Sequence, residues 1–539
     1  MGAPLLAVLV ASVLLAALAR RYDVSAPLGL VVAGLAVGLI PGVPAIEMQP
    51  QLVMFVVLPQ LVMFVVLPPL LWSAGLESSY LALRKNVRPI GLLAVGLPLA
   101  TTLVVGFVAF HTVPELTVAA ALTLGAIVAP PDAVSAAAIG RRLGLPRQIM
   151  TLLGGESLLN DATALTAYKV ALAAAIGAAA TWQGALGTFA LAALGGVVIG
   201  GLIGWLIEFI RTWLDDPLVE SAIGLVAPYF VYWLAEEAHG SGVIAVVVAA
   251  LLLGQRATRA SYATRLQDDA VWKSIQLVLE SFAFLMIGLQ LPTVIDELTG
   301  IRAVTLAVAS AAVLATVIAV RIVWVYVMAY TPRMLFRGVR DREPAPTPSQ
   351  VFIVAWAGMR GVVSLAAAFG VPLVTLSGDP FPGRPQLVFL TFVVVIGTLL
   401  LHGLTLPWLI RTLDVRSEAE AHQDALEQAA ASSRAAQAAA DRLDELLARS
   451  SDSSAQQHVG EVLQSWNDRR RNAVWERLGR SDDDIGESPA SAMRRLRLEM
   501  LAAERETYIA ERDAGNIDDE VLRSVLHGLD LEEAALNRE

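Results

Sequence analysis

Three apolar stretches of the sequence carry ionisable side chains near their middles. LGAIVAPPDAVSAAAIG contains Asp132, LLGGESLLNDATALTAYKVALA contains Glu156 and Asp161, and VAWAGMRGVVSLAAAFG contains Arg360. Charged groups in hydrocarbon are costly, so such residues are functional candidates by default. Three acids against one arginine leave surplus negative charge, which a proton or a metal cation can neutralise. This balance favours transport of cations or protons.

The second of these stretches repeats polar residues at the spacing of a helical turn. Glu156 and Asn160 are four residues apart, as are Ser157 and Asp161, so all four share one broad face of a helix. Carboxylate, hydroxyl and carbonyl oxygens are the ligands that a hard monovalent cation prefers. Asp161, Ser157 and Asp132 could supply them, and we therefore predict a site for a monovalent cation at these three residues.

The other two stretches carry residues that interrupt helices. Pro130 and Pro131 precede Asp132 and remove two backbone donors, which frees carbonyl groups from the helical ladder. Gly358 and Gly361 flank Arg360 and give the third stretch the composition for a second break. Broken helices recur at ion sites near the midplane of transporters.

Structural roles are open alternatives for several of the ionisable residues. Glu156 and Arg360 are predicted to form an ion pair in the core, which either supports the site or only locks the helices together. Lys169 is expected to extend its ammonium toward the membrane surface. Glu280 and Arg321 are expected to lie behind the ion site or at helix interfaces.

The composition places these residues in a membrane protein with a charged tail. The 539 residues are 56% hydrophobic and 16% charged, and their mean hydropathy is +0.62. Residues 415–539 hold 16 Arg and 27 Asp or Glu, whereas residues 1–414 hold only 23 basic and 22 acidic side chains. A soluble enzyme and a nucleic-acid binder are disfavoured, and the absence of cysteine excludes disulfides and thiolate metal sites.

Apolar runs long enough to cross a bilayer of about 30 Å predict an all-α polytopic fold with about thirteen transmembrane helices. The predicted spans are 3–20, 26–45, 52–76, 90–110, 116–140, 148–178, 185–210, 217–237, 240–255, 271–291, 301–329, 350–376 and 386–410. Within residues 51–68 the nonapeptide QLVMFVVLP occurs twice in succession. Nine helical residues turn by about 900°, so the copies present opposite faces, and we attach no function to the repeat.

Basic residues predict the orientation of these spans. Alternate connections hold 18 of the 23 basic residues before the tail, and the opposite connections hold only Arg302 and Arg384. By the positive-inside rule, the N-terminus lies outside and the tail is cytoplasmic. The expected location is the plasma (inner) membrane.

At these residues the chain resembles the NhaP-like branch of the monovalent cation:proton antiporters, which includes the sodium/proton exchangers. The motifs that carry the resemblance are GGESLLNDATAL at 154–165, APPDAVSA at 129–136, LPPLLWSAGLES at 67–78 and GMRGVVSLAAA at 358–368. The resemblance implies two inverted six-helix repeats joined by a further helix, with the fifth and twelfth predicted spans, 116–140 and 350–376, broken. It also implies a core bundle that moves against a dimerisation domain, and hence a homodimer.

The resemblance further assigns roles to individual residues. It makes Asp161 the carboxylate that binds Na⁺ and the proton, Asp132 a second carboxylate of the Na⁺ site and Ser157 a hydroxyl ligand of that site. Asn160 and Glu156 would be held by Arg360, and the Asn160–Asp161 pair resembles the electroneutral branch.

Two departures from the family pattern leave the choice among Na⁺, Li⁺ and K⁺ open. In the predicted span 116–140, the family's usual Thr-Asp-Pro is replaced by Pro131-Asp132-Ala133, so a hydroxyl is lost, although the backbone carbonyl of Pro131 could still bind the ion. In the predicted span 52–76, Ser73 stands where some family members carry an acid.

The sequence therefore predicts two domains. Residues 1–414 form a transmembrane antiporter domain that exchanges Na⁺ for H⁺ by alternating access, serving pH and sodium homeostasis, without a cofactor or nucleic acid. Residues 415–539 form a cytoplasmic helical tail that either aids assembly or is regulatory. The alternatives are a K⁺/H⁺ antiporter of the same fold, a cation channel and, more weakly, an intramembrane hydrolase.

Overall fold

The structure, a computed structural model, describes residues 2–22, 26–39, 62–178, 182–214, 216–256, 261–298, 302–335, 345–415, 418–449, 458–465, 467–468, 489–514, 516 and 519–538. The chain divides into two compact units, Met1–Arg416 and Ser417–Glu539. Of the repeated nonapeptide, the first copy lies outside the described residues, and residues 62–68 of the second copy begin a helix.

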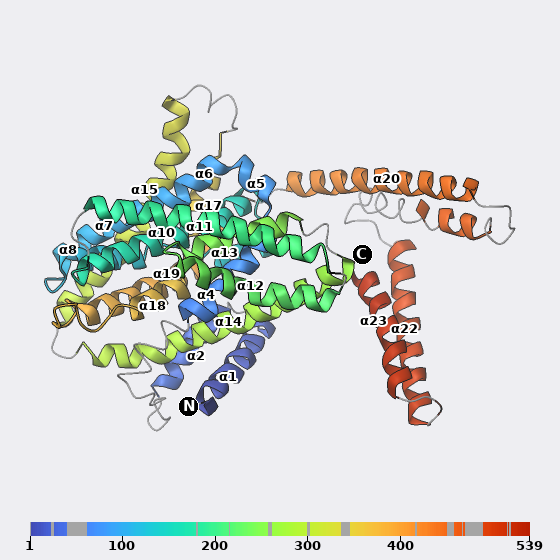
Figure 1. Cartoon of the computed structure of the whole chain (residues 1–539), viewed down its shortest axis with the longest axis horizontal. Coiled ribbons are helices and arrows are strands. Elements are labelled where there is room, and N and C mark those ends of the chain that lie inside the picture. Colours follow the sequence, from blue (N-terminus) through green and yellow to red (C-terminus); the bar gives the residue numbers. More distant parts are fainter. Residues whose placement is uncertain are drawn as a thin grey trace. The chain divides into compact units, whose positions relative to one another are not determined.

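The predicted all-α fold is confirmed. Among the described residues the β structure is limited to an isolated bridge between Val374 and Pro380. The helices of the first unit (Figure 1) are α1 (Gly2–Arg21), α2 (Ala26–Gly38), α4 (Leu67–Glu77, preceded by a π-helical turn at Val62–Val66), α5 (Tyr80–Lys85), α6 (Val87–Gly91), α7 (Leu97–Thr112), α8 (Val118–Ile127), α9 (Ala133–Leu143), α10 (Arg147–Ala175), α11 (Trp182–Arg211), α12 (Pro217–Glu237), α13 (Gly242–Arg256), α14 (Tyr262–Asp296), α15 (Ala303–Leu335), α17 (Pro348–Trp356), α18 (Val362–Phe369) and α19 (Arg384–Thr412).

Membrane-crossing helices are evident from length and composition. Within the described ranges, six helical segments are long and apolar enough to cross a membrane: Val87–Thr112, Ala190–Arg211, Pro217–Glu237, Ala263–Asp296, Ala303–Leu335 and Arg384–Thr412. Four further apolar helices are shorter: Ala26–Gly38, Phe64–Glu77, Val118–Ile127 and Gly242–Arg256. The chain is thus a multi-pass membrane protein, and the total of thirteen spans stays a prediction.

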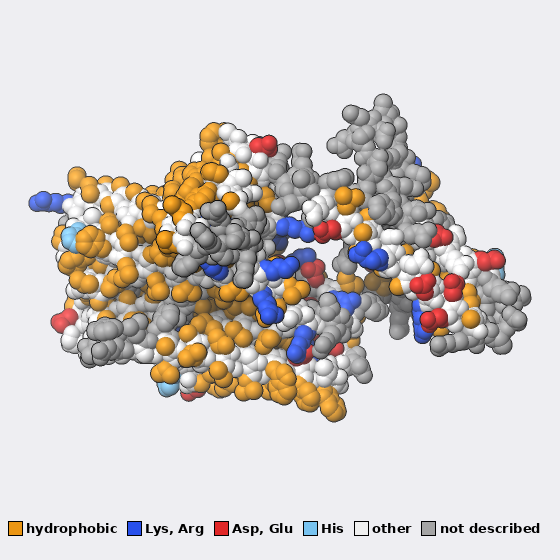
Figure 2. Space-filling view, turned by 90° about the horizontal axis from the view of Figure 1, so that it is seen from above, with side chains coloured by type: hydrophobic (Ala, Val, Ile, Leu, Met, Phe, Trp, Pro, Cys, Tyr) orange, Lys and Arg blue, Asp and Glu red, His pale blue; other side chains and the backbone are white. Residues whose placement is uncertain are grey.

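The surface of the first unit agrees with a lipid environment. Apolar side chains cover most of its visible flank, and most visible Lys and Arg side chains gather toward one end (Figure 2). On α11, for example, Leu191, Leu202 and Trp205 are each more than half exposed. A continuous apolar surface of this kind is unfavourable in water and suits a bilayer.

Small residues allow the helices of this unit to approach closely, as is common in membranes. Gly34 of α2 lies against the backbone of α14, where an added Cβ would be 2.5 Å from the carbonyl oxygen of Leu285. Along α11, Gly196, Gly200 and Gly204 face the backbone of α13 and the residue before it in the same way.

The second unit contains α20 (Glu418–Arg449) and a hairpin of α22 (Pro489–Asp513) and α23 (Asp519–Arg538). Charged pairs connect the two hairpin helices: Arg497 binds Glu532, and Arg505 binds Asp530 and Glu533. The helical structure predicted for the tail is present, whereas its cytoplasmic location stays a prediction.

Candidate ion-binding site

Two interrupted helices cross at the centre of the first unit. Residues 128–132 separate α8 from α9, and residues 357–361 separate α17 from α18, so the predicted breaks are confirmed. At the crossing, the backbone N–H of Asp132 donates a hydrogen bond of 2.6 Å to the carbonyl of Met359. The prolines of one break and the glycines of the other thus bring non-helical backbone together from distant parts of the sequence.

The two glycines of the GMRG motif make this crossing possible. A Cβ on Gly361 would lie 2.7 Å from Cβ of Asp132, and a Cβ on Gly358 would collide with Cδ of Arg321. Each glycine therefore provides space for one ionisable side chain.

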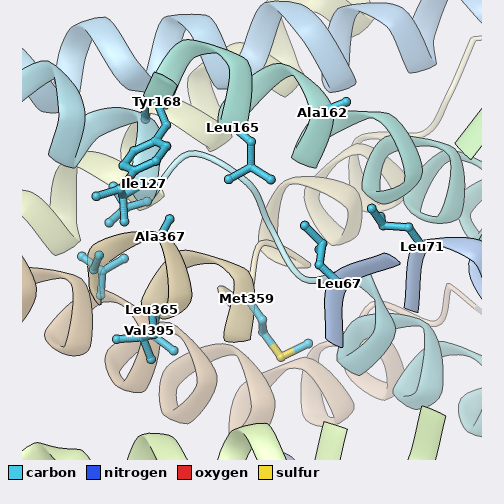
Figure 3. Packing of buried hydrophobic residues seen from close by; sticks show 14 of the residues in the cluster. Leu67, Leu71, Ile127, Ala162, Leu165, Tyr168, Met359, Leu365, Ala367 and Val395 are labelled. Carbon is cyan, nitrogen blue, oxygen red and sulfur yellow. The ribbon is translucent and has the colours of Figure 1, made fainter. Parts of the chain in front are cut away.

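Apolar side chains pack around the breaks and hold them in place (Figure 3). Ala162, Leu165 and Tyr168 of α10 and Leu365 and Ala367 of α18 belong to one cluster of buried side chains. Such dense packing keeps lipid away from the non-helical backbone at the breaks. Non-helical backbone is tolerated at membrane depth only where protein or a cavity surrounds it.

Most of the predicted ligands meet at one cavity. A cavity of about 480 Å³ is lined by Asp132, Ser157 and Asp161, together with Pro131. Asn160 is fully buried beside them, and its Nδ2 donates to the carbonyl of Pro131 at 3.3 Å. The amide of Asn160 therefore positions the broken backbone. Glu77 and Arg141 also line this cavity, as does Glu280.

Ser73 does not belong to this set. Its side chain is buried, and its hydroxyl donates to the carbonyl of Leu70 in its own helix at 3.0 Å. The cavity lining does not include it.

The cavity can hold a cation by its chemistry. Two carboxylates, a hydroxyl and a backbone carbonyl at the cavity are all hard oxygen ligands. Asp161 is only 9% exposed, so two ionised carboxylates at this depth are unfavourable until a proton or a cation compensates their charge.

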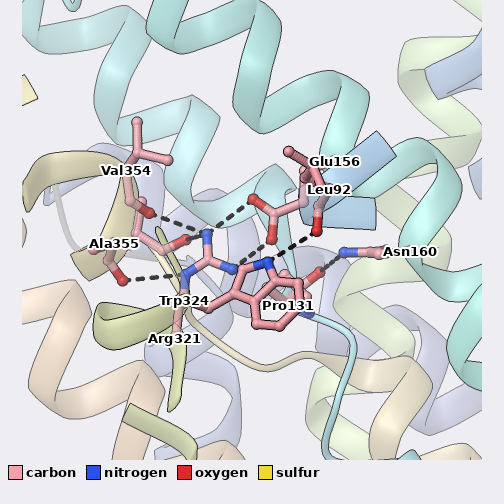
Figure 4. Close-up of polar contacts among 9 residues, drawn as sticks. Leu92, Pro131, Glu156, Asn160, Arg321, Trp324, Val354 and Ala355 are labelled. Atoms are coloured by element: carbon pink, nitrogen blue, oxygen red, sulfur yellow. Dashed lines mark hydrogen bonds and ion pairs between the residues drawn. The ribbon is translucent and has the colours of Figure 1, made fainter. Parts of the chain in front are cut away.

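The sequence predicted an ion pair between Glu156 and Arg360, and this prediction is wrong about the arginine. Glu156 pairs instead with Arg321 of α15, whose Nη1 and Nη2 contact its two carboxylate oxygens, the latter at 2.9 Å (Figure 4). Nε of Arg321 donates to the carbonyl of Ala355 at 3.1 Å, and Nη2 donates to that of Val354 at 3.0 Å. Arg321 thus binds two partners. One is the C-terminal end of α17, whose free carbonyl groups attract a cation, and the other is the buried carboxylate of Glu156.

Arg360 lies in the break itself and is fully buried. Its backbone N–H donates to Oγ1 of Thr398 at 3.0 Å. Its three guanidinium nitrogens have no hydrogen-bond partner among the described residues. The sequence showed both arginines in apolar helices, but only the crossing of α15 with α17 determines which one reaches Glu156.

Lys169 also has a partner that the sequence did not indicate. Its ammonium contacts both carboxylate oxygens of Glu236 at 2.7 and 2.6 Å, and Glu236 accepts a hydrogen bond from the backbone of Gly242 at 3.0 Å. This pair connects α10 with the end of α12 and the start of α13.

Comparisons with known proteins agree with this arrangement. A family model described as sodium/hydrogen exchanger, transmembrane, matches residues 7–412. The chain is 34% identical to an uncharacterized Na⁺/H⁺ exchanger of Mycobacterium tuberculosis, over 99% of this chain and 96% of that protein. It is 31% identical to the sodium, potassium, lithium and rubidium/H⁺ antiporter of Bacillus pumilus, over 64% of this chain and 53% of that protein.

A solved structure shares the fold. The sodium proton antiporter MjNhaP1 from Methanocaldococcus jannaschii superposes with a TM-score of 0.57 at 19% identity, covering 76% of this chain and 98% of that chain. The likeness extends the sequence match to the helical architecture. With its broken helices, its acidic cavity and a family match over three quarters of its length, the chain belongs to the sodium/hydrogen exchanger family.

Proposed function

We propose that this protein is a secondary antiporter that exchanges Na⁺ for H⁺ by alternating access. The observation that carries the proposal is the cavity that contains Asp161, Asp132 and Ser157 where two broken helices cross. The names of the relatives, Na⁺/H⁺ exchanger and sodium proton antiporter, support it.

In the proposed mechanism, Asp161 holds either a proton or Na⁺. Its burial disfavours the bare carboxylate, whereas either cation restores neutrality. Asp132 and Ser157 contribute further oxygens to the bound ion, and the Pro131 carbonyl, positioned by Asn160, completes the set. Exchange requires that the occupied site changes sides of the membrane and that the empty, charged site does not.

The pairing of Glu156 with Arg321 suits electroneutral exchange. Because this acid has its own arginine, it is not available to bind a second proton. We therefore expect one proton per Na⁺, carried at Asp161. A homodimer remains part of the proposal, because the family resemblance implies it.

We further propose that the protein lies in the plasma membrane with the cavity open to the cytoplasm. Arg141 lines the cavity, and the connections next to it carry Arg84, Lys85, Arg142 and Arg147. These connections are cytoplasmic by the positive-inside rule. The same alternation of basic connections places the tail on the cytoplasmic side.

The test is collapse of a pH gradient in everted membrane vesicles, reported by a dye, on adding NaCl, LiCl, KCl or choline chloride. The proposal predicts a response to NaCl and none to choline chloride. Vesicles that contain the protein but respond to no alkali cation at any pH would contradict it.

A broader cation selectivity is the second candidate. It is favoured by the likeness to the Bacillus pumilus antiporter, whose name includes potassium and rubidium, and by the loss of a hydroxyl before Asp132. A response to KCl equal to that to NaCl would favour this candidate over a Na⁺-selective exchanger.

A further inference from the structure

One acidic side chain of the cavity has no part in the mechanism proposed above. Glu280 lies near the middle of α14, and it lines the same cavity as Asp132 and Asp161. Gln276 and Phe284 line it as well, at one helical turn to either side. Residues four apart share a helix face, so this face of α14 forms a wall of the cavity.

Glu280 has no cationic partner among the described residues. Its carboxylate accepts one hydrogen bond of 2.8 Å, from Nε2 of Gln276 in its own helix. The charged side chains that act on it electrostatically include the acids Asp132 and Glu77 and a single arginine, Arg20 of α1. Its surroundings therefore resemble those of Asp161, whereas Glu156 differs because Arg321 neutralises it.

A structural role explains these contacts poorly. A carboxylate at membrane depth is costly, and a purely structural acid is normally paired. The hydrogen bond from Gln276 orients the carboxylate but does not neutralise it, and Arg20, the cation that acts on it, forms no ion pair with it. Asp132 and Glu77 add to that charge and do not relieve it.

We propose that Glu280, which Gln276 orients, is a second cation-binding position in the cavity. It receives the transported alkali cation before that cation reaches Asp161, and this role rests on the proposed function. Its carboxylate and the side-chain oxygen of Gln276 are hard oxygen ligands. A cation held there reduces the repulsion between Glu280 and Asp132. The position belongs to the state in which this cavity is open.

The role is specific to one side of the membrane, and this makes it testable. Removing one negative charge about 3–6 Å from the ion, in a cavity open to water with an effective dielectric constant of about 80, weakens the attraction by about three- to tenfold. Glu280→Gln should therefore raise the apparent KM for Na⁺ by this factor from the face to which the cavity opens. The maximal rate should change less than twofold, because Asp161 is intact.

The experiment measures Na⁺-dependent proton flux in everted and in right-side-out vesicles. It compares wild type, Glu280→Gln, Glu280→Asp, and Glu237→Gln as control. Glu237 is an exposed acid at the end of α12 and does not line the cavity. We expect a raised KM for Glu280→Gln from one face only, substantial rescue by Glu280→Asp, and wild-type values for Glu237→Gln.

Other outcomes would overturn the role. Wild-type flux together with an unchanged KM for Glu280→Gln from both faces would remove Glu280 and leave the proposed function intact. An equal loss of protein yield and maximal rate in both Glu280 variants would show a structural role. Absence of any cation-dependent flux in the wild type would remove the proposed function and this role with it.

Discussion

Arginine–carboxylate pairs occur in both units of the molecule, but in different solvents. Arg321 and Glu156 form a two-pronged pair in the membrane unit, where each side chain is 2% exposed. Arg497 and Glu532 form a similar pair in the tail hairpin, at 2.6 and 2.8 Å, where the side chains are 27% and 44% exposed. The geometry is alike, and the surroundings differ.

The difference shows that geometry alone does not set the importance of an ion pair. In the membrane unit, loss of one partner leaves a buried charge without compensation, which costs about 3–5 kcal/mol. In the tail, water and salt solvate either partner when the other is lost, so little stability depends on the pair.

The largest effect is expected for Arg321→Ala. This change leaves Glu156 charged and unpaired and frees the carbonyl groups at the end of α17, so it should destabilise the protein by about 3–5 kcal/mol. Thermal unfolding of the detergent-solubilised protein, followed by size-exclusion chromatography, measures it.

The double variant Arg321→Met, Glu156→Leu is the control for this prediction, since apolar replacement of both partners removes the buried charge. It should unfold at a higher temperature than Arg321→Ala. If the single variant unfolds like wild type, the pair does not stabilise the core.

Gly358→Ala is expected to have the next largest effect. The added methyl group collides with Arg321, which is held at both ends of its guanidinium group. Overpacking of this kind costs about 1–3 kcal/mol. The same assay measures it, with Gly201→Ala as control, because nothing lies within 4 Å of a Cβ at Gly201. Equal unfolding temperatures for the two variants would contradict the close approach.

Lys169→Ala should have a smaller effect. The side chains of Lys169 and Glu236 are 53% and 30% exposed, so their pair contributes at most about 1 kcal/mol. The unfolding temperature should drop slightly, and less in high salt than in low salt. A loss as large as that of Arg321→Ala would show that the pair is shielded from water.

The smallest effect is expected in the tail and depends on pH. The side chain of Arg497 holds the pKa of Glu532 below its usual value through a hydrogen bond. Because the pKa of Glu532 is lower in the folded than in the unfolded protein, the ionised carboxylate stabilises the fold. This stabilisation is complete above the pKa of Glu in the unfolded chain, about 4.3, and is lost as the pH falls through the pKa of Glu532 in the folded protein. Hydrogen exchange in α22 and α23 of the whole protein should accelerate slightly below pH 4, and less so in Arg497→Ala. Equal acceleration in both proteins would exclude this pair as the cause.

The sequence predicts much of the site because membranes restrict the choices. A charge in an apolar helix must have a function or a partner, so the sequence singled out Asp132 and Asp161, and helical spacing added Ser157. The structure places all three at one cavity, and their role as ligands stays a prediction. The breaks at Pro130 and Gly358 were also predicted from the sequence. The partner of Glu156 was not found, because Arg321 and Arg360 satisfy the same sequence criterion. The position of Glu280 at the cavity and the pairing of Lys169 with Glu236 depend on how α14 and α12 pack against other helices, and sequence spacing within one helix contains no information about that.

The proposed exchange depends above all on competition between Na⁺ and H⁺ at Asp161. Na⁺-dependent proton flux should be measured for wild type and Asp161→Asn over a series of pH values. The apparent Na⁺ affinity of the wild type should weaken in acid by up to about tenfold per pH unit, as expected when one proton is displaced per cation. Asp161→Asn should reach the membrane and exchange nothing, because the amide binds no proton. Substantial exchange by that variant, or a wild-type Na⁺ affinity independent of pH, would contradict the account.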